Sequence, residues 1–358
     1  MTAFNNNWPK AYPELAVSGQ FRVLNEDFQV TELSNRKLKK EGPHLFLFIE
    51  KKGANTHWLA RKIADHAHLD LKDVGYAGLK DRHGVTRQWF SLPIKDKNPD
   101  LSHLFAKEEF TLLSQGYYGV KLKRGALGGN SFRLVIKNIE GDKKAIEQRL
   151  ELIRQRGVPN YFGPQRFGNN FENLNQAQQL FETGKRPRNK QKGSMYISAA
   201  RSYLFNEMLA KRIDQSCWDK PMKGEVFGFA GSLRGFSQEN SLEEAQRWRE
   251  NEIHPTCALW GKNESLSTSD LQDIENTVAH ENNIFSDGLV AKGLKQERRA
   301  SRMLIPDLFW MWQGGNLVLR FSLASGYFAT SLLRELGDIQ EYSREYFSES
   351  RVEENSGE

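Results

Sequence analysis

The sequence predicts an α/β (α+β) protein in which a mainly helical segment is inserted into a mixed α/β domain. Alternating apolar and polar residues, typical of strands, recur through the first half, and from about Gly141 the apolar spacing becomes helical. A strand pattern followed by a helix pattern returns near the C-terminus. A length of 358 residues predicts two domains, or one domain with a large insertion.

The expected strands of the first half are separated by short turns. A turn at residues 25–27 divides FRVLNEDFQVTEL into two strands, and Gly84 separates VGYAGL from VTRQWFSL. Asn55 and Thr56 can cap a helix that carries Leu59 and Ile63 on one face. Further strands are expected at HLFLFIEKKG (44–53), TLLSQ (111–115), YYGVKLKR (117–124) and SFRLVIKNI (131–139).

The second half is expected to be mostly helical up to about residue 300. Helical spacing marks DKKAIEQRLELIRQRG (142–157), NLNQAQQLFETG (173–184) and MYISAARSYLFNEMLAKRI (195–213). GKRPRNKQKG (184–193) is expected to be a solvated basic loop, although an RNA-facing loop has the same composition. NLVLRFSL (316–323) should then pair into the N-terminal sheet, because a strand is not stable alone. The acidic tail, residues 343–358, is expected to be disordered.

Charge and composition indicate an anionic partner. The net charge is +6, which suits nucleic acid, an anionic membrane surface or an acidic protein, and an aromatic content of 11% favours nucleic acid because bases stack on rings. Cys217 and Cys257 lack the spacing of a zinc site and indicate free thiols in a reducing compartment. No apolar leader and no stretch of membrane-spanning length is present, so the expected location is the cytoplasm.

The segment GYAGLKDRHGVTRQWF (75–90) is the most informative part of the chain. One carboxylate, Asp81, stands among Lys80, Arg82, His83 and Arg87, with aromatic residues on either side. Opposite charge favours the carboxylate anion, which suits a nucleophile or a base, while cations and rings suit a polyanion that carries bases. The alternative is a turn with solvated surface charges, which the charge pattern alone favours. The position of Asp81 between two expected strands favours a site.

Other stretches carry candidate binding residues, each with a structural alternative. Phe28 follows a turn rich in carboxylates, Asn130 follows two glycines, and Phe132 lies on an expected strand. Phe328 stands at a helix start, beside a Ser-Gly turn. Taken singly, the two strand phenylalanines are typical of a core and Asn130 of a turn. An asparagine amide beside glycines can also donate to and accept from a base edge.

Together these stretches resemble the TruD family of tRNA pseudouridine synthases. The matching segments extend from about Phe21 to Leu336, and GLKD combined with VPNYFGPQRFG (158–168) is the most specific part. The other matching segments are FRVLNEDFQVTEL, GALGGNSFRL, YISAARSYLFNEML and SGYFATSLLREL. The chain departs from the family pattern at Arg22, where members often carry lysine; the charge is kept, but a point-charge role is altered.

The resemblance implies isomerisation of a uridine in tRNA, at position 13 in the family, to its C-glycoside. The N1–C1′ bond is cut, the uracil turns, and it is rejoined through C5. Asp81 would be the catalytic carboxylate, either attacking C1′ or removing the C2′ proton. No cofactor and no metal are implied, since nothing is oxidised and no group is added. The implied partner is tRNA, with no membrane and no obligate protein partner.

The resemblance also implies a substrate pocket and a domain plan. Phe28, Asn130 and Phe328 match the family's substrate-contacting positions, and Phe132 and Arg22 would complete the pocket. Rings at these positions can offset the stacking that a flipped uridine loses, at about 1–3 kcal/mol per base. The implied fold is the pseudouridine-synthase mixed sheet with an inserted, mainly helical domain and a cleft between them. Residues 1–158 and 305–342 would form the catalytic domain, and residues 159–304 the inserted TRUD domain.

Two alternative functions have distinct signatures. A non-catalytic RNA-binding protein would use the same basic, aromatic surface and tolerate changes at Asp81. An RNA methyltransferase would need a glycine-rich cofactor loop between a strand and a helix, and the sequence contains none.

Overall fold

The computed structural model describes residues 4, 7–94, 99–105, 110–126, 128–185, 187–237 and 242–342. These residues form two compact units. The sheet unit comprises Ala16–Ile146, Asp307–Ser325 and the residues from Asp338 onward. The helix-rich unit comprises the residues up to Leu15, together with Glu147–Pro306 and Gly326–Gly337. The division into a catalytic domain (1–158 and 305–342) and an inserted domain (159–304) stays a prediction. The compact units divide instead after Ile146 and after Pro306, and the residues up to Leu15 and Gly326–Gly337 belong to the helix-rich unit.

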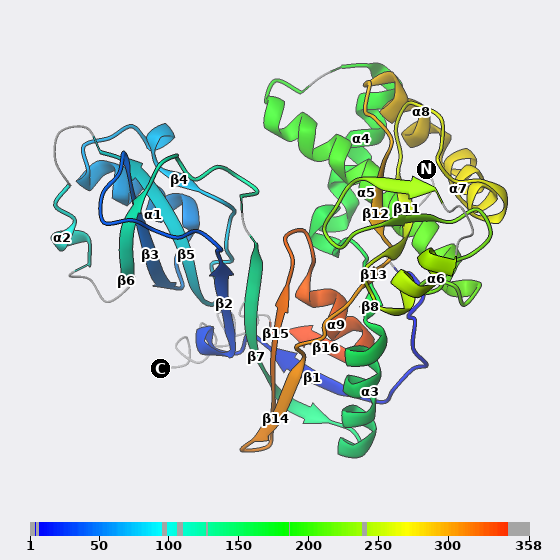
Figure 1. The fold of residues 1–358 in the computed structure, drawn as a ribbon, viewed down its shortest axis with the longest axis horizontal. Coiled ribbons are helices and arrows are strands. Elements are labelled where there is room, and N and C mark those ends of the chain that lie inside the picture. The colour runs from blue at the N-terminus through cyan, green and yellow to red at the C-terminus, as the bar shows by residue number, and fades with distance from the viewer. Residues whose placement is uncertain are drawn as a thin grey trace, which may run out of the picture. The chain divides into compact units, whose positions relative to one another are not determined.

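The sheet unit is built on a mixed, ten-stranded sheet (Figure 1). Seven strands follow the order β14-β15-β7-β2-β5-β3-β6, with β1 joined to β7 and β16, and β4 joined to β5. The β2–β5 and β1–β16 pairs are parallel, and the other pairs are antiparallel. The strands are β1 (Ser18–Phe21), β2 (Phe28–Leu33), β3 (His44–Lys52), β4 (Gly75–Tyr76), β5 (Val85–Pro93), β6 (Phe110–Tyr118), β7 (Gly129–Glu140), β14 (Phe309–Gln313), β15 (Asn316–Leu323) and β16 (Asp338–Glu341).

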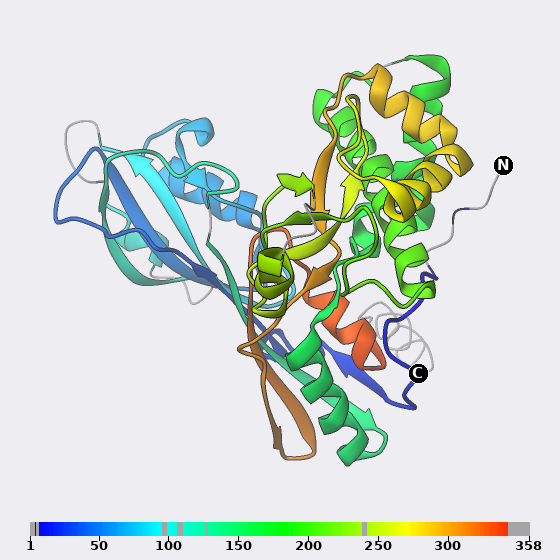
Figure 2. The same ribbon diagram turned by 45° about the vertical axis from the view of Figure 1, so that its right-hand side comes forward.

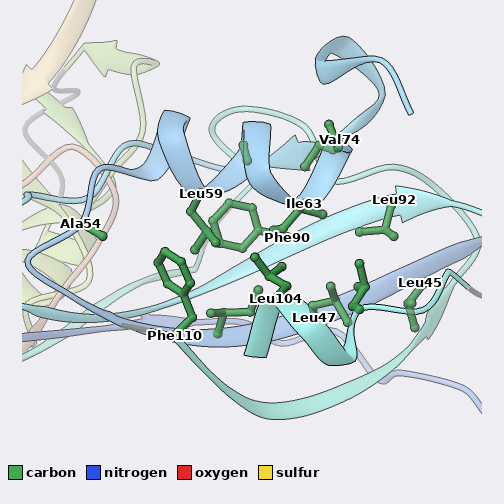
Figure 3. Packing of buried hydrophobic residues seen from close by; sticks show 14 residues of the cluster. Leu45, Leu47, Ala54, Leu59, Ile63, Val74, Phe90, Leu92, Leu104 and Phe110 are labelled. Atoms are coloured by element: carbon green, nitrogen blue, oxygen red, sulfur yellow. The ribbon is translucent and has the colours of Figure 1, made fainter. Parts of the chain in front are cut away.

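One core of the sheet unit lies between helix α1 (Thr56–His66) and strands β3 and β5. Leu59 and Ile63 of α1 point toward Phe90 of β5, as Figure 3 shows, and all three are fully buried. The short helix α2 (Ser102–Phe105) closes one side through Leu104. The predicted cap is confirmed: the Asn55 side chain accepts a hydrogen bond from the backbone N–H of His57.

The helix-rich unit packs α4, α7 and α8 against the 25-residue helix α5. A four-stranded sheet lies beside these helices (Figure 2). Its strand order is β10-β9-β11-β12, and β8 pairs separately with β13. Helix α3 continues from the sheet unit into this unit. Its elements are α3 (Lys143–Arg156), β8 (Val158–Pro159), α4 (Glu172–Thr183), α5 (Lys190–Asp214), β9 (Val226–Gly228), β10 (Gly235–Ser237), α6 (Leu242–Arg249), β11 (His254–Leu259), α7 (Ser269–Glu281), α8 (Asn283–Ala291), β12 (Glu297–Ala300), β13 (Arg302–Met303) and α9 (Ala329–Leu336).

The predicted mixed α/β fold is confirmed, and several predicted elements differ in detail. TLLSQ and the first two residues of YYGVKLKR form one strand, which ends at Tyr118. The N–H of Leu122 donates to the Ser91 side chain and not to a strand backbone. Only Gly75–Tyr76 of VGYAGL is paired. The second half of GKRPRNKQKG is already helix α5, since Asn189 caps it. The small sheet between residues 226 and 300 was missed. The expected disordered tail lies outside the described residues.

Two further expectations can be compared with the structure. NLVLRFSL forms β15 and pairs antiparallel with β7, so its predicted return to the N-terminal sheet is confirmed. No helix in the part of the chain that the structure describes is long and apolar enough to cross a membrane.

Candidate active site around Asp81

The loop between β4 and β5 holds Asp81 through its backbone. The Lys80 N–H donates to Thr56 Oγ1 at 2.9 Å, and Lys51 Nζ donates to the Asp81 carbonyl at 3.1 Å. The Gly53 N–H donates to the carbonyl of Gly84 at 3.2 Å. These bonds attach the loop to α1 and to the end of β3, so the Asp81 backbone is fixed before any ligand binds.

The Asp81 carboxylate faces outward and has one oxygen in use. Its side chain is 57% exposed, and its Oδ2 accepts a hydrogen bond from Arg22 Nη2 at 2.6 Å. No described residue donates to Oδ1. An exposed, oriented carboxylate with an unused oxygen can attack a carbon or accept a proton.

Arg22 connects three parts of the site. Its Nη1 donates to Glu341 Oε1 at 2.7 Å while Nη2 holds Asp81. Its guanidinium lies 3.8 Å from the ring centroid of Phe28 and 5.4 Å from that of Phe21, so it also stacks on aromatic rings. Arg22 has a positive φ of 64°, immediately after β1, and this turn directs the side chain to the Asp81 loop.

Phe28 and Phe132 are both core residues of the sheet unit. Their side chains are 4% and 9% exposed, and their rings meet edge to face at 6.4 Å. Phe132 also stacks on Phe321 of β15 at 5.2 Å. A base could reach the ring face of Phe28 that Arg22 covers only if the guanidinium moved aside.

Asn130 presents an acceptor that has no partner. It lies on β7, in register with Glu32 of β2 and Leu323 of β15. Its Oδ1 is buried and accepts no hydrogen bond from any described residue. A buried oxygen without a donor is costly, and the N–H of a nucleobase edge could satisfy it.

Phe328 lies in the helix-rich unit, at the residue that precedes helix α9. Its half-buried ring lies 6.3 Å from that of Phe162, which belongs to the VPNYFGPQRFG segment. The structure therefore joins Asp81, Arg22, Phe28 and Phe132 in one chain of contacts and places Phe328 in the other compact unit.

Two residues that contact Asp81 or Arg22, Lys51 and Glu341, were not predicted from the sequence. Lys51 is fully buried, and its Nζ also donates to the Ala54 carbonyl at 2.6 Å. Burial, opposed by the attraction of Asp81, lowers the pKa of Lys51 to about 8. The available signal was its position on the buried face of β3, shared with Leu47 and Ile49. Glu341 gave no local signal.

A buried ion pair supports the base of the loop. Lys80 Nζ lies 2.9 Å from Glu32 Oε1, and both side chains are almost fully enclosed. Burial raises the pKa of Glu32, while the nearby Lys80 opposes this rise. Glu32 Oε2 also accepts from the Trp89 N–H at 2.8 Å, so the pair ties β2 to β5. Within the described ranges, no group of three or more His, Cys, Asp or Glu residues could hold a metal ion.

Comparisons with known proteins match nearly the whole chain. A family model described as tRNA pseudouridine synthase D (TruD) matches residues 12–177 and 171–336. A tRNA pseudouridine synthase D of Methylococcus capsulatus is 42% identical over 331 residues, covering 92% of this chain and 93% of its own. The protein of the same name from Hydrogenovibrio crunogenus is 42% identical, covering 88% and 91%.

A solved structure has the same fold. A structure from Methanosarcina mazei that is assigned to tRNA pseudouridine synthase D superposes with a TM-score of 0.72. The superposition covers 93% of this chain and 96% of that one, at 21% sequence identity.

Proposed function

This chain belongs to the tRNA pseudouridine synthase D (TruD) family and isomerises uridine to pseudouridine in tRNA, and we propose that it does so at position 13, with Asp81 as the catalytic carboxylate. The observation that supports this role is the geometry of Asp81. Its Oδ2 is held by Arg22 at 2.6 Å, and its exposed Oδ1 accepts no hydrogen bond from the described residues. The carboxylate is thus oriented and still able to react.

Arg22 supports the reaction by holding the carboxylate. Its guanidinium cannot rotate freely, because Glu341 and the Phe28 ring fix its other contacts. A planar guanidinium that bridges two carboxylates orients each of them more strictly than an ammonium group does. Arg22 is therefore a positioning residue for Asp81, and the arginine at this site makes a bridge that one lysine would not reproduce.

Asp81 acts by one of two routes, and in each route every bond and proton is accounted for. In the first, Asp81 bonds to C1′ as the N1–C1′ electron pair leaves with the uracil, and C5 of the turned uracil then displaces the carboxylate. In the second, Asp81 takes the C2′ proton as the uracil leaves, and returns it when C5 adds to C1′. In both routes C5 loses its proton at the end and N1 gains one.

The remaining predicted residues would bind the uridine. Asn130 offers its unpaired Oδ1 to a uracil N–H, and the Phe28 ring, covered by the Arg22 guanidinium, would support the side of the site on which the uridine lies. Phe328 would stack on the flipped base, and Phe132 would support the Phe28 ring from the core. The reacting uridine would lie in tRNA, and the enzyme would act in the cytoplasm. The proposed steps use neither a metal nor a cofactor.

The experiment uses tRNA transcripts tritiated at C5 of uridine. Incubation with the enzyme should release tritium, and mapping should place pseudouridine at position 13. Asp81→Asn should release none, while binding tRNA as tightly as the unaltered protein or more tightly, because one anion is lost and no phosphate contact is removed. Appreciable turnover by Asp81→Asn would refute the role of Asp81. Pseudouridine at another position would refute only the proposed site in tRNA.

A further inference from the structure

A pocket of about 570 Å³ lies in the sheet unit, beside strand β4, and neither the resemblance nor the proposed mechanism assigns it a role. Buried Val74 and Leu122 form its apolar part, and Tyr76 forms an aromatic wall. Its volume falls within the range of about 300–1,000 Å³ that is usual for small-ligand sites. Tyr76 precedes Asp81 by a few residues, within the same GYAGLKD segment.

The pocket carries a strongly basic rim. Lys72, Lys121, Lys123 and Arg124 line it, together with His57, and no carboxylate lines it. Lys72 is paired with Asp70 at 2.8 Å, whereas Lys123 and Arg124 are exposed and form no ion pair with the described residues. Such a rim has a net positive potential and attracts anions.

The loop that carries the rim cations, residues 121–125, is fixed by backbone hydrogen bonds, so the pocket exists before a ligand binds. The Leu122 N–H donates to Ser91 Oγ at 2.9 Å, and the Gly125 N–H donates to the Ala77 carbonyl at 2.8 Å. Gly75 permits this packing, because a Cβ there would collide with the Leu122 carbonyl and with Ser91 Oγ. Cations on a loop fixed by backbone bonds lose little conformational freedom when a ligand binds.

The aromatic wall indicates a base as well as a phosphate. Tyr76 is half-buried, its hydroxyl lies 3.5 Å from His57 Nδ1, and the Arg124 guanidinium lies 6.0 Å from its ring centroid. We propose that this pocket binds a nucleotide of the tRNA other than the reacting uridine, with its phosphate at Lys123 and Arg124 and its base against Tyr76. The proposal rests on the proposed function for its ligand, because a tRNA substrate supplies linked bases and phosphates.

The role of this contact is to hold the substrate on the segment that carries the catalytic carboxylate. Tyr76 and Asp81 belong to one continuous stretch of chain. Tyr76 pairs with β5, and at the other end Lys80 and Asp81 are bonded to Thr56 of α1 and Lys51 of β3. A nucleotide bound here would raise tRNA affinity without touching the reacting atoms. Its loss should therefore raise KM and leave kcat nearly unchanged.

The test compares two doubly charge-reversed variants. Lys123→Glu with Arg124→Glu alters the pocket, and Lys143→Glu with Lys144→Glu alters two exposed lysines of the same unit that do not line it. The pocket variant should bind tRNA at least about tenfold more weakly near 0.1 M salt, and its salt dependence should be smaller by about 0.7–0.9 in log–log slope for each lost phosphate contact. The control should change tRNA affinity by less than about threefold. Thermal unfolding of both variants checks that each remains folded.

A third variant and a free ligand identify what the pocket recognises. Tyr76→Leu should weaken tRNA binding with the salt slope unchanged, because it removes a stacking surface and no charge. Uridine monophosphate, titrated against the protein and followed by NMR, tests whether a free nucleotide fills the pocket. Equal tRNA affinity in the pocket and control variants would overturn the proposal, and nucleotide binding with unaltered tRNA affinity would assign the pocket to a free nucleotide instead. Absence of pseudouridine formation by the unaltered enzyme would refute the proposed function and leave these binding results interpretable.

Discussion

Arg22 Nη2 lies 2.6 Å from Asp81 Oδ2, although 59 positions separate the two residues in the sequence. The same guanidinium holds Glu341 and covers the ring of Phe28. One side chain thus links the end of β1, the Asp81 loop, strand β2 and strand β16. The conformation of the proposed catalytic carboxylate depends on a residue that does not itself need to touch the substrate.

Substitution of Arg22 should separate charge from geometry. Arg22→Lys keeps one positive charge but cannot bridge both carboxylates, so we expect kcat to fall by about three- to tenfold. Arg22→Met leaves Asp81 without its partner, and we expect a loss of more than about tenfold. Tritium release at saturating tRNA measures both. Turnover by Arg22→Met at the level of the unaltered enzyme would show that Asp81 needs no positioning partner.

Lys51 should make stability depend on pH in the alkaline range. Its pKa is about 8 in the folded protein and 10.5 when unperturbed, so the unfolded chain binds more protons between these values. Stability contributed by this group therefore rises as the pH increases from about 8 to 10.5 and is lowest below about pH 8.

The measurement compares unfolding by urea for the unaltered protein and Lys51→Met at several pH values. Other titrating groups contribute equally to both proteins, so the difference between their free energies of unfolding isolates Lys51. We expect that difference to change between pH 8 and 10.5 in favour of the unaltered protein. A difference that stays constant over this range would contradict the lowered pKa.

Gly84 should not tolerate even one extra methyl group. A Cβ there would lie 2.6 Å from the carbonyl oxygen of Phe28 and 3.0 Å from its ring, and the parallel pairing of β2 with β5 prevents the backbone from moving away. We expect Gly84→Ala to lower the free energy of unfolding by about 1–3 kcal/mol. Gly119→Ala is the matched control, since a Cβ there meets nothing within 4 Å. Equal denaturation midpoints for the two variants would contradict the close contact.

Asn130 should show an activity cost without a stability cost. Its Oδ1 is buried without a donor among the described residues, so Asn130→Ala removes an unsatisfied acceptor and should leave the melting temperature unchanged or raise it. If uracil donates to this oxygen, the same variant should lower kcat/KM by at least about tenfold. A variant that is less stable and fully active would show that Asn130 is only structural.

Some strands of the sheet unit could be predicted because their burial alternates. In β2 the buried residues Phe28, Val30 and Glu32 recur at every second position, which is the signal that sequence patterns detect. Strand β11 gives no such signal, since each of its residues is buried and both faces are covered. The residues around it are polar and helical, so the small sheet of the helix-rich unit was not predicted.

The candidate site was predictable where its residues form motifs and not where they meet through folding. Asp81 stands out locally by its cationic neighbours. Glu341 is separated from Arg22 by 319 positions, and only the parallel pairing of β16 with β1 brings the two together. Lys51 is fully buried, although lysine is usually exposed. A buried charged residue can be recognised from sequence only when the strand register is known. The functional roles of Phe28, Asn130, Phe132 and Phe328 remain predictions.

Strand β15 should be indispensable for the sheet unit. It lies between β14 and β7 and pairs with β7 from Leu317 to Leu323, at the far end of the chain from the N-terminal strands. A chain that ends at residue 315 would lose this strand, leave β14 without a partner and expose Phe132 of β7, on which Phe321 stacks. We expect that truncation to abolish cooperative unfolding of the sheet unit and all turnover.

A chain that ends at Tyr342 is the control, because it keeps every described strand and lacks only the acidic residues 343–358. It should unfold at the temperature of the full chain and convert uridine at the same rate. Phe328→Ala in the full chain supplies the complementary test: with β15 intact, it should remain folded and lose activity equivalent to about 1–3 kcal/mol if its ring stacks on the flipped base. No other described strand could replace the pairing of β15 with β7 on that side. A folded, active enzyme after truncation at 315 would therefore show that β15 is dispensable for the sheet.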